Sequence, residues 1–254
     1  MNLIHSLILG LVEGLTEFLP VSSTGHLILT AKILALPQSE FLKSFEIIIQ
    51  LGAILAVVAL YGRSLLLNAE ILKRILAAFL PSAVLGLFFY KFIKKFLLSS
   101  QIVLWALFAG GVLLILFEIF HREKETATDE ISKMSYRQSF LIGVFQSFAF
   151  VPGVSRSAAT ILGGMGVGLK RKTVVEFSFV LAVPTMLAAT GLDLLKSGRP
   201  FSGDEILLLA TGLAASFAVA VFGMRFFLNF IKNNNFIGFG VWRIAVAVLF
   251  WCLR

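Results

Sequence analysis

Two acidic side chains lie four residues apart near the start of the chain, inside an otherwise apolar stretch: Glu13 and Glu17. On a helix they share one face, with Cβ atoms about 5–6 Å apart. Two carboxylates that close repel each other unless a cation or a proton lies between them. The spacing therefore predicts a Mg²⁺ or Ca²⁺ site that water and a substrate phosphate complete. The alternative is a glutamate pair on a hairpin that projects into water, but the apolar surroundings favour the functional interpretation.

Hydroxyl groups and a histidine follow the glutamates, in the segment Ser22-Ser-Thr-Gly-His26. Because the hydroxyls come after Pro20 and before an apolar run, they predict the N-cap of a short helix. His26 lies three residues after Ser23, so we expect its ring to reach the Ser23 hydroxyl across the first helical turn. Two roles stay open here, since the histidine could activate the hydroxyl as a base or itself act as nucleophile or acid.

A second polar island interrupts another apolar stretch, in the segment Pro152-Gly-Val-Ser-Arg-Ser-Ala-Ala-Thr160. Arg156 is its single charge, flanked by Ser155 and Ser157. Its fork of donors suits phosphate oxygens, and the alternative is an ion pair with one of the two glutamates, because buried charges need partners. Both can hold, in resting and substrate-bound states. Together these groups indicate phosphoryl transfer. The carboxylates could hold a metal ion, arginine and the helix ends could bind phosphate, and serine with histidine could carry out the transfer.

The chain as a whole has the composition of an integral membrane protein. Of its 254 residues, 58% are hydrophobic and only 14% are charged, whereas a soluble domain carries about 25% charged residues. The polar islands interrupt two apolar runs, 3–36 and 138–168. Non-helical backbone at membrane depth is tolerated only when it is buried in protein or lines a water-filled cavity. We therefore predict an all-α membrane protein with two re-entrant helical hairpins and six transmembrane helices, at about 45–61, 75–92, 102–120, 174–192, 206–224 and 236–252.

The basic excess indicates membrane orientation rather than nucleic-acid binding. The formal net charge is +8, but the basic residues occur in short clusters between apolar runs. Positive charge on cytoplasmic loops and attraction to anionic lipid explain this pattern, so nucleic acid is not an expected partner. One set of loops holds twelve basic residues, against eight on the other side: 62–74, 121–137, 169–173 and 225–235. These loops are predicted to be cytoplasmic, which places both termini outside.

The two halves of the chain repeat weakly. Three pairs of like residues share one offset of 132 positions: Pro20 with Pro152, Ser23 with Ser155, and Phe45 with Phe177. If each half is a hairpin plus three crossings, the second copy is inverted, and the hairpins meet tip to tip near the midplane. We expect a single membrane domain over 1–254, with repeats at about 1–120 and 137–254 and a hydrophilic linker at about 121–136.

At these motifs the chain resembles the undecaprenyl-diphosphate phosphatase family, known also for bacitracin resistance. The resemblance rests on Glu13–His26 and Pro152–Thr160 and continues through 45–52, 136–138 and 176–184. It implies hydrolysis of the C55 polyprenyl diphosphate to its monophosphate and inorganic phosphate, with a divalent cation. That reaction recycles the lipid carrier for peptidoglycan at the outer face of the bacterial plasma membrane. The implied partners are this lipid and membrane lipids, and a second copy of the chain is a further candidate.

The resemblance and the motifs together define the predicted site. The predicted catalytic residues are Glu17, Ser23, His26 and Arg156, and the predicted metal ligands are Glu13 and Glu17. The predicted substrate-binding residues are Ser22, Thr24, Gly25, Gly153, Ser155, Ser157 and Thr160. The other large class of membrane lipid phosphatases needs a late histidine, which is missing after His121. A transporter or flippase of polyprenyl phosphate remains the alternative, because inverted repeats with broken helices are a carrier architecture.

Overall fold

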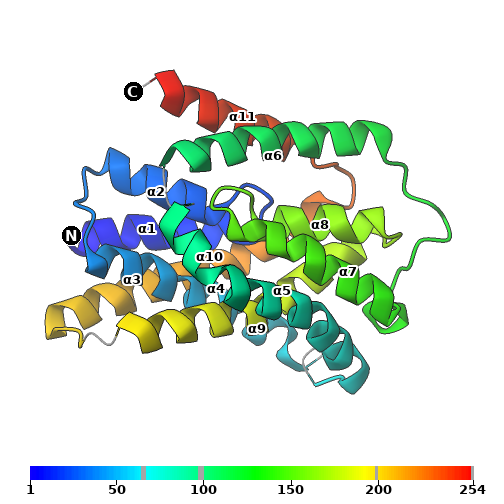
Figure 1. Ribbon diagram of the computed structural model, residues 1–254, viewed down its shortest axis with the longest axis horizontal. Coiled ribbons are helices and arrows are strands. Elements are labelled where there is room, and N and C mark those ends of the chain that lie inside the picture. Colours follow the sequence, from blue (N-terminus) through cyan, green and yellow to red (C-terminus); the bar gives the residue numbers. More distant parts are fainter. Residues whose placement is uncertain (64–66, 97–99, 198–199, 253–254) are drawn as a thin grey trace.

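The computed structural model describes residues 1–63, 67–96, 100–197 and 200–252, and within these ranges every regular element is a helix (Figure 1). In this part of the chain five spans are long and apolar enough to cross a membrane. They are α3 with α4 (Glu40–Ile48 and Gln50–Tyr61), α5 (Ala69–Phe96), α6 (Ser100–Phe120), α9 (Arg171–Ser197) and α10 (Gly203–Phe230).

The sixth predicted crossing forms a shorter helix, α11 (Ile237–Cys252). Its 16 residues span about 24 Å, somewhat less than the hydrocarbon thickness of about 30 Å. Large apolar side chains are exposed along the long helices, for example Leu80 at 59% and Phe88 at 80% on α5. Exposed apolar area of this extent fits lipid contact rather than water. The chain is therefore a multi-pass membrane protein.

Each of the two predicted hairpins is a pair of short helices joined by a turn. The first consists of α1 (Leu3–Thr16) and α2 (Ser23–Ile33). The second consists of α7 (Tyr136–Gln146), the 3₁₀ turn η3 (Ser147–Phe150) and α8 (Arg156–Gly166). Within each hairpin the two helices pack against each other, and Figure 1 shows the hairpins opening toward opposite ends of the molecule.

The hairpin tips meet in the middle of the helix bundle. The first tip is the turn from α1 into α2 (residues 17–23), and the second is the turn from η3 into α8 (residues 151–157). The Ser157 hydroxyl of the second tip donates to the backbone oxygen of Leu19 in the first tip at 2.8 Å. Arg156 reaches Glu17 across the same junction at 2.8 Å. The prediction that the two distant polar islands converge is thus confirmed.

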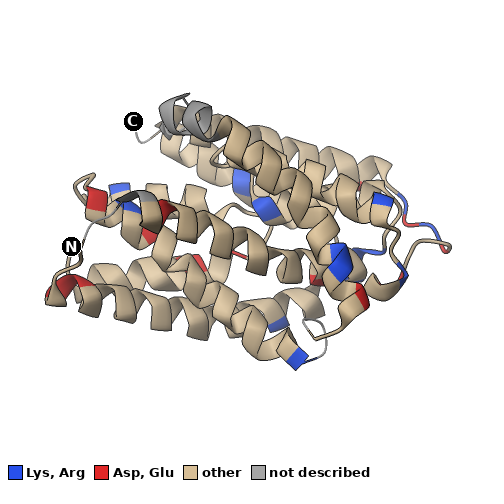
Figure 2. Cartoon of the chain, turned by 60° about the horizontal axis from the view of Figure 1, so that its bottom comes forward, with Lys and Arg blue, Asp and Glu red and all other residues tan. Residues whose placement is uncertain are grey.

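The loops predicted to share one side of the membrane do lie together. Arg74 Nε donates to the backbone oxygen of Met134 at 2.6 Å, near the 3₁₀ turn η2 (Ile131–Lys133) of the linker. Lys170 N donates to Thr128 O at 2.9 Å. Figure 2 shows most charged residues at the two ends of the bundle, with few in its middle. Arg199 and Arg254, which enter the charge count for the opposite side, lie outside the described residues.

Glycines let the hairpins approach the long helices closely. A Cβ on Gly10 of α1 would overlap the backbone oxygen of Gly212 on α10, and a Cβ on Gly143 of α7 would overlap the backbone oxygen of Ala78 on α5. Neighbouring helices in membranes associate through such small residues, which allow close packing of their backbones. The hydrophobic effect does not drive this association, because lipid tails are as apolar as the side chains. Both hairpins are therefore fixed by backbone-to-backbone packing.

The Gly143→Ala substitution is expected to destabilise the protein by about 1–3 kcal/mol, because rigid backbone must shift to admit the methyl group. The thermal midpoint in detergent should then fall by about 2–4 °C per kcal/mol for a chain of this length. Gly166→Ala is the matched control, since a Cβ there meets nothing within 4 Å. An unchanged midpoint for Gly143→Ala would show that α5 and α7 are not packed as closely as described.

Candidate active site

A cavity of about 220 Å³ lies where the two hairpin tips meet α9. Gln50, the first residue of α4, and Thr185 of α9 contribute to its wall, together with Gln146 at the end of α7. Seven of the twelve predicted site residues line it: Glu17, Ser22, Ser23, Thr24, Gly153, Ser155 and Arg156.

A chain of polar contacts links the two tips across this cavity. Arg156 Nη2 donates to Glu17 Oε1 at 2.8 Å, and Ser23 Oγ donates to Glu17 Oε2 at 2.5 Å. The other arm of the guanidinium, Nη1, donates to the backbone oxygen of Ser178 on α9 at 2.7 Å. The side chains of Arg156 and Glu17 are only 11% and 4% exposed. The ion pair between the hairpins is therefore formed, and its carboxylate also orders the Ser23 hydroxyl.

Arg156 keeps donor capacity for an anion despite this pairing. Its Nε is buried and has no hydrogen-bond partner among the described residues. The guanidinium lies over the ring of Phe18, with its Cζ 5.8 Å from the ring centroid, and Phe18 in turn packs against the edge of Phe179. Because a guanidinium carries five N–H donors in a rigid fork, phosphate oxygens can bind beside Glu17 rather than in its place.

Glu13 is the least satisfied charged group of the site. It is fully buried, and neither carboxylate oxygen has a hydrogen-bond partner in the described part of the chain. The charges of Glu17 and Glu46 act on it, as does that of Arg156. A buried carboxylate without a partner is costly, so this group suits a cation or a proton.

Glu13 does not line the cavity, so a cation bound to it would need further ligands from water and substrate. The described residues include no group of three or more His, Cys, Asp or Glu side chains placed to hold a metal ion. Magnesium, however, usually keeps several waters and binds through one or two carboxylates plus substrate phosphates. Glu13 offers two free oxygens, while those of Glu17 already accept from Arg156 and Ser23. Glu13 is thus the stronger candidate ligand of the predicted pair.

Each tip ends in a serine that begins the following helix with a strained backbone. Ser22 has φ 73° and Ser155 has φ 76°, in the left-handed region that non-glycine residues rarely enter. Ser22 Oγ accepts from Gly25 N at 3.3 Å, and Ser155 Oγ accepts from Ala158 N at 3.2 Å. Such strain costs about 1–3 kcal/mol and gathers at functional sites. The first residues of α2 and α8 line the cavity, and helix N-termini bind anions.

This geometry corrects the predicted register of the repeat. Ser22 and Ser155 have the same backbone conformation and the same capping role, and they are 133 positions apart. Gly10 and Gly143, which make matching close approaches, share this offset. The predicted pairing of Ser23 with Ser155 is therefore wrong by one position, because the tips differ by one residue between proline and cap.

The predicted contact between Ser23 and His26 is also not formed. His26 Nδ1 bonds to the backbone oxygen of Ser22 at 2.8 Å, and Trp242 Nε1 donates to His26 Nε2 at 2.9 Å. Both ring nitrogens are thus occupied, which fixes the neutral ring with its proton on Nδ1. The rings of His26 and Trp242 are parallel to within 8°. His26 does not line the cavity, and its ring is held instead by Trp242 of α11.

Three predicted substrate-binding residues serve inside the protein instead. Ser157 ties the tips together through Leu19 O, and Thr160 is fully buried with its hydroxyl 2.6 Å from Ser178 Oγ. The Gly25 amide completes the cap of α2. These groups do not line the cavity, because their side of each short helix faces the neighbouring helices. In this structure these groups support the site, and their role in binding substrate stays a prediction.

Arg243 of α11 is a central residue that the sequence reasoning missed. It is fully buried and donates only to backbone oxygens, including Pro20 O of the first tip at 3.3 Å and Val154 and Gly153 O of the second at 2.9 Å. Its remaining donors reach Ala106 and Leu107 on α6. One guanidinium thus holds both tips and α6. The signal that could have identified it is an arginine inside the apolar run 236–252.

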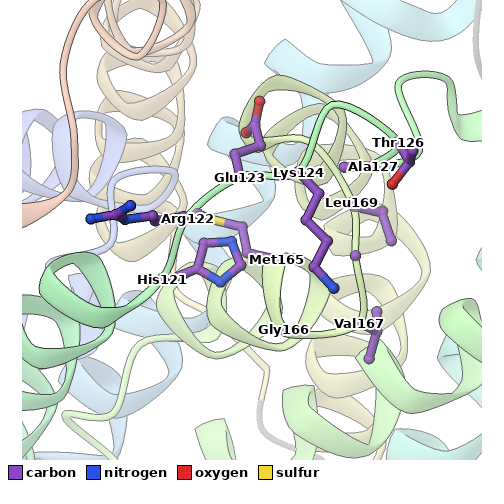
Figure 3. A pocket seen from close by; sticks show the side chains of 11 residues that line it. His121, Arg122, Glu123, Lys124, Thr126, Ala127, Met165, Gly166, Val167 and Leu169 are labelled. Carbon is purple, nitrogen blue, oxygen red and sulfur yellow. The ribbon is translucent and has the colours of Figure 1, made fainter.

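A larger cavity of about 430 Å³ lies elsewhere, at the end of the bundle that holds the hydrophilic linker (Figure 3). Its wall is formed by residues 121–127 and 165–169, and none of the predicted site residues contributes to it. Figure 3 shows that His121 and Lys124 belong to a loop beside the end of α8. Volume alone does not identify a catalytic site, and the convergent buried polar groups favour the smaller cavity.

Comparison with known proteins identifies the family of this chain. Residues 6–249 match the family model described as bacitracin resistance protein BacA. A relative from Persephonella marina, named undecaprenyl-diphosphatase, is 49% identical over 250 residues that cover 98% of both chains. A relative of the same name from Aquifex aeolicus is 49% identical, over 97% of this chain and 96% of its own. One from Wolinella succinogenes is 44% identical, over 98% of this chain and 97% of its own. The chain belongs to the bacitracin resistance protein BacA family.

Proposed function

We propose that this protein hydrolyses undecaprenyl diphosphate to undecaprenyl phosphate and inorganic phosphate. The observation that carries the proposal is the convergence of Arg156, Glu17 and Ser23 at one buried cavity between two hairpin tips. Phosphoryl transfer needs positive groups for the phosphate oxygens and a positioned nucleophile, and this cavity supplies both. The reaction recycles the lipid carrier of cell-wall synthesis, in keeping with relatives named for this activity and with bacitracin resistance.

Ser23 is the proposed nucleophile and Glu17 its base, a role predicted earlier for His26. The Ser23 hydroxyl already donates to Glu17 Oε2, so the carboxylate can take this proton as Oγ attacks the terminal phosphorus. The bond from this phosphorus to the bridging oxygen breaks, and undecaprenyl phosphate leaves with the electron pair. Water then attacks the phosphoserine, the Oγ–phosphorus bond breaks, Glu17 returns the proton to Oγ, and inorganic phosphate leaves.

The remaining groups position and neutralise the phosphates. Arg156 binds phosphate oxygens through the donors not used by Glu17 and Ser178, and the N-termini of α2 and α8 add backbone N–H groups. Glu13, with Glu17 as a second carboxylate, is the proposed holder of a divalent cation, Mg²⁺ in preference to Ca²⁺. When bound, such an ion neutralises charge on the phosphate oxygens. His26 positions α2 against α11 through Trp242.

The finer architecture is part of the same proposal: six crossings with α11 as the sixth, two re-entrant hairpins, and inverted repeats at about 1–120 and 137–254. Helix packing supports the repeats, because α1 packs on α10 while its counterpart α7 packs on α5, and α6 packs on α11. The end that holds the linker carries more basic residues and is the proposed cytoplasmic side. The cavity then opens toward the outer face of the bacterial plasma membrane.

The purified protein in detergent is expected to release phosphate from polyprenyl diphosphate with Mg²⁺. Ser23→Ala should lower kcat by about 10³-fold or more, as the loss of a nucleophile does in other enzymes. Substrate labelled on its terminal phosphate should leave label on Ser23 after acid quenching. Ser132→Ala, at a half-buried residue of the hydrophilic linker that does not line the cavity, is the matched control and should keep full activity.

Two outcomes separate the parts of this proposal. Wild-type protein that releases no phosphate would reject the hydrolase and favour transport of the lipid. Release that persists in Ser23→Ala, with no label on the enzyme, would retain hydrolysis and reject the serine route.

A further inference from the structure

Gln146 is a buried polar residue of the cavity to which the mechanism above gives no role. It is the last residue of α7, directly before the second tip, and only 2% of it is exposed. It lines the cavity together with Arg156 and Ser23. Its side-chain oxygen, Oε1, is buried and has no hydrogen-bond partner among the described residues. A buried acceptor in this condition destabilises the fold, so its presence at a catalytic cavity points to a function.

The orientation of the Gln146 amide is fixed by its neighbours. Gln146 Nε2 donates to Ser82 Oγ on α5 at 2.8 Å. Ser82 cannot return this hydrogen bond, because its own hydroxyl proton goes to the backbone oxygen of Phe79 at 2.8 Å. Ser82 therefore only accepts from Gln146, and the amide must keep its nitrogen toward α5. Oε1 is left as the unpartnered group of a residue that lines the cavity, and an amide oxygen is an acceptor only.

The corrected repeat register supports a functional place for this oxygen. At the offset of 133 positions that pairs Ser22 with Ser155, Gln146 is the counterpart of Glu13. The oxygens of both side chains are buried and without hydrogen-bond partners in the described part of the chain. The two hairpins thus each carry one buried acceptor group at corresponding positions, one charged and one neutral, and of the two residues only Gln146 lines the cavity.

We propose that Gln146 accepts a hydrogen bond from the water that attacks phosphorus during phosphate release. Because phosphate oxygens are themselves acceptors, they would repel Oε1, whereas a water molecule can donate to it. One O–H of the attacking water donates a hydrogen bond to Oε1, and the lone pair of the water then points toward phosphorus. The water keeps both protons until inorganic phosphate has formed. A neutral amide suits this task, since a carboxylate there would add to the negative charge around the substrate. This inference rests on the hydrolysis proposed above.

The test compares Gln146→Met, which keeps the length of the side chain but has no comparable acceptor, with wild-type enzyme. We expect kcat for polyprenyl diphosphate to fall by about 10–100-fold, the usual scale for one positioned hydrogen-bonding group, with KM changed less than about 3-fold. Because the lost step is attack by water, the fraction of enzyme that carries labelled phosphate at steady state should rise. A purely structural role would not raise this fraction.

Two further variants make the comparison specific. Ser82→Ala removes the group that orients the amide, so it should lower kcat partially in wild-type enzyme and have no additional effect when combined with Gln146→Met. Gln138→Met is the matched control on the same helix, because Gln138 lies outside the cavity and its amide is satisfied by Ser135 N and Val167 O. It should lower thermal stability without changing kcat.

Three results would overturn the inference. The first is an unchanged kcat in Gln146→Met while wild-type enzyme hydrolyses the lipid, which would leave the proposed function intact. The second is recovery of kcat at high Mg²⁺, because Oε1 would then be a cation ligand. The third is equal loss of kcat in Gln146→Met and Gln138→Met in proportion to their stability, because the role would then be structural. Failure of the wild type itself to hydrolyse the lipid would remove both proposals.

Discussion

Arg156→Lys is expected to lower kcat/KM for undecaprenyl diphosphate by about 10³-fold, the lower end of the effect of an arginine that stabilises a transferring phosphoryl group. The ammonium keeps a positive charge beside Glu17, but it cannot bond at the same time to Glu17, Ser178 and phosphate as the guanidinium fork does. Stability should change little, because the buried carboxylate retains a counter-ion. The measurement is steady-state phosphate release beside thermal unfolding in detergent.

A second substitution at this position separates chemistry from folding. Arg156→Met leaves Glu17 buried and unpaired, so it should destabilise the protein by about 3–5 kcal/mol. Adding Glu17→Gln removes the uncompensated charge and should restore most of this stability while activity stays lost. Near-normal activity in Arg156→Lys, or no recovery of stability in the double variant, would contradict the arrangement described for this ion pair.

Arg243→Met is expected to be the most destabilising single change in α11. It leaves three backbone oxygens of the two tips without this donor, while the oxygens of Ala106 and Leu107 keep their helical bonds within α6; each buried unsatisfied acceptor costs about 1–3 kcal/mol. Relaxation of the tips will reduce the sum, so we expect a loss of at least about 3 kcal/mol, with activity falling in parallel. Arg225→Met is the matched control, because Arg225 is exposed on α10 and should tolerate the change.

Gly110→Ala tests the same arrangement without removing the charge. A methyl group at Gly110 on α6 would overlap Nη2 of Arg243 and displace the guanidinium from the tips. The variant should lose activity in the same direction as Arg243→Met, with a smaller loss of stability. Full activity in Gly110→Ala together with a stable Arg243→Met would show that the tips are held by other contacts.

The convergence of the polar islands could be predicted because its cause is visible in the sequence. Glu13, Glu17 and Arg156 are charges inside apolar runs, and charges at that depth must find partners or water. The breaks at Pro20 and Pro152 then leave hairpins as the economical structure. These two rules together place Arg156 beside a glutamate without any knowledge of distances.

The contacts that sequence could not supply depend on distant or backbone partners. His26 is three residues from Ser23, yet its ring is held by Trp242, 216 positions away. The acceptors of Arg243 are carbonyl oxygens, which every residue carries, so no pairing pattern marks them. Ser157 and Thr160 look like the other hydroxyls of their motif, and only the packing of α8 decides that they face the protein. Position within a motif does not reveal which side of a short helix meets the substrate.

The order of synthesis gives the last consequence. Because α11 follows every other helix described here, both tips are already in place when Arg243 arrives to join their carbonyl oxygens to α6. Until that moment the two tips are joined by contacts such as Ser157 with Leu19 and Arg156 with Glu17, but they lack the hydrogen bonds that Arg243 shares between them. A nascent chain is therefore expected to turn over the lipid at full rate only after α11 has packed against both tips.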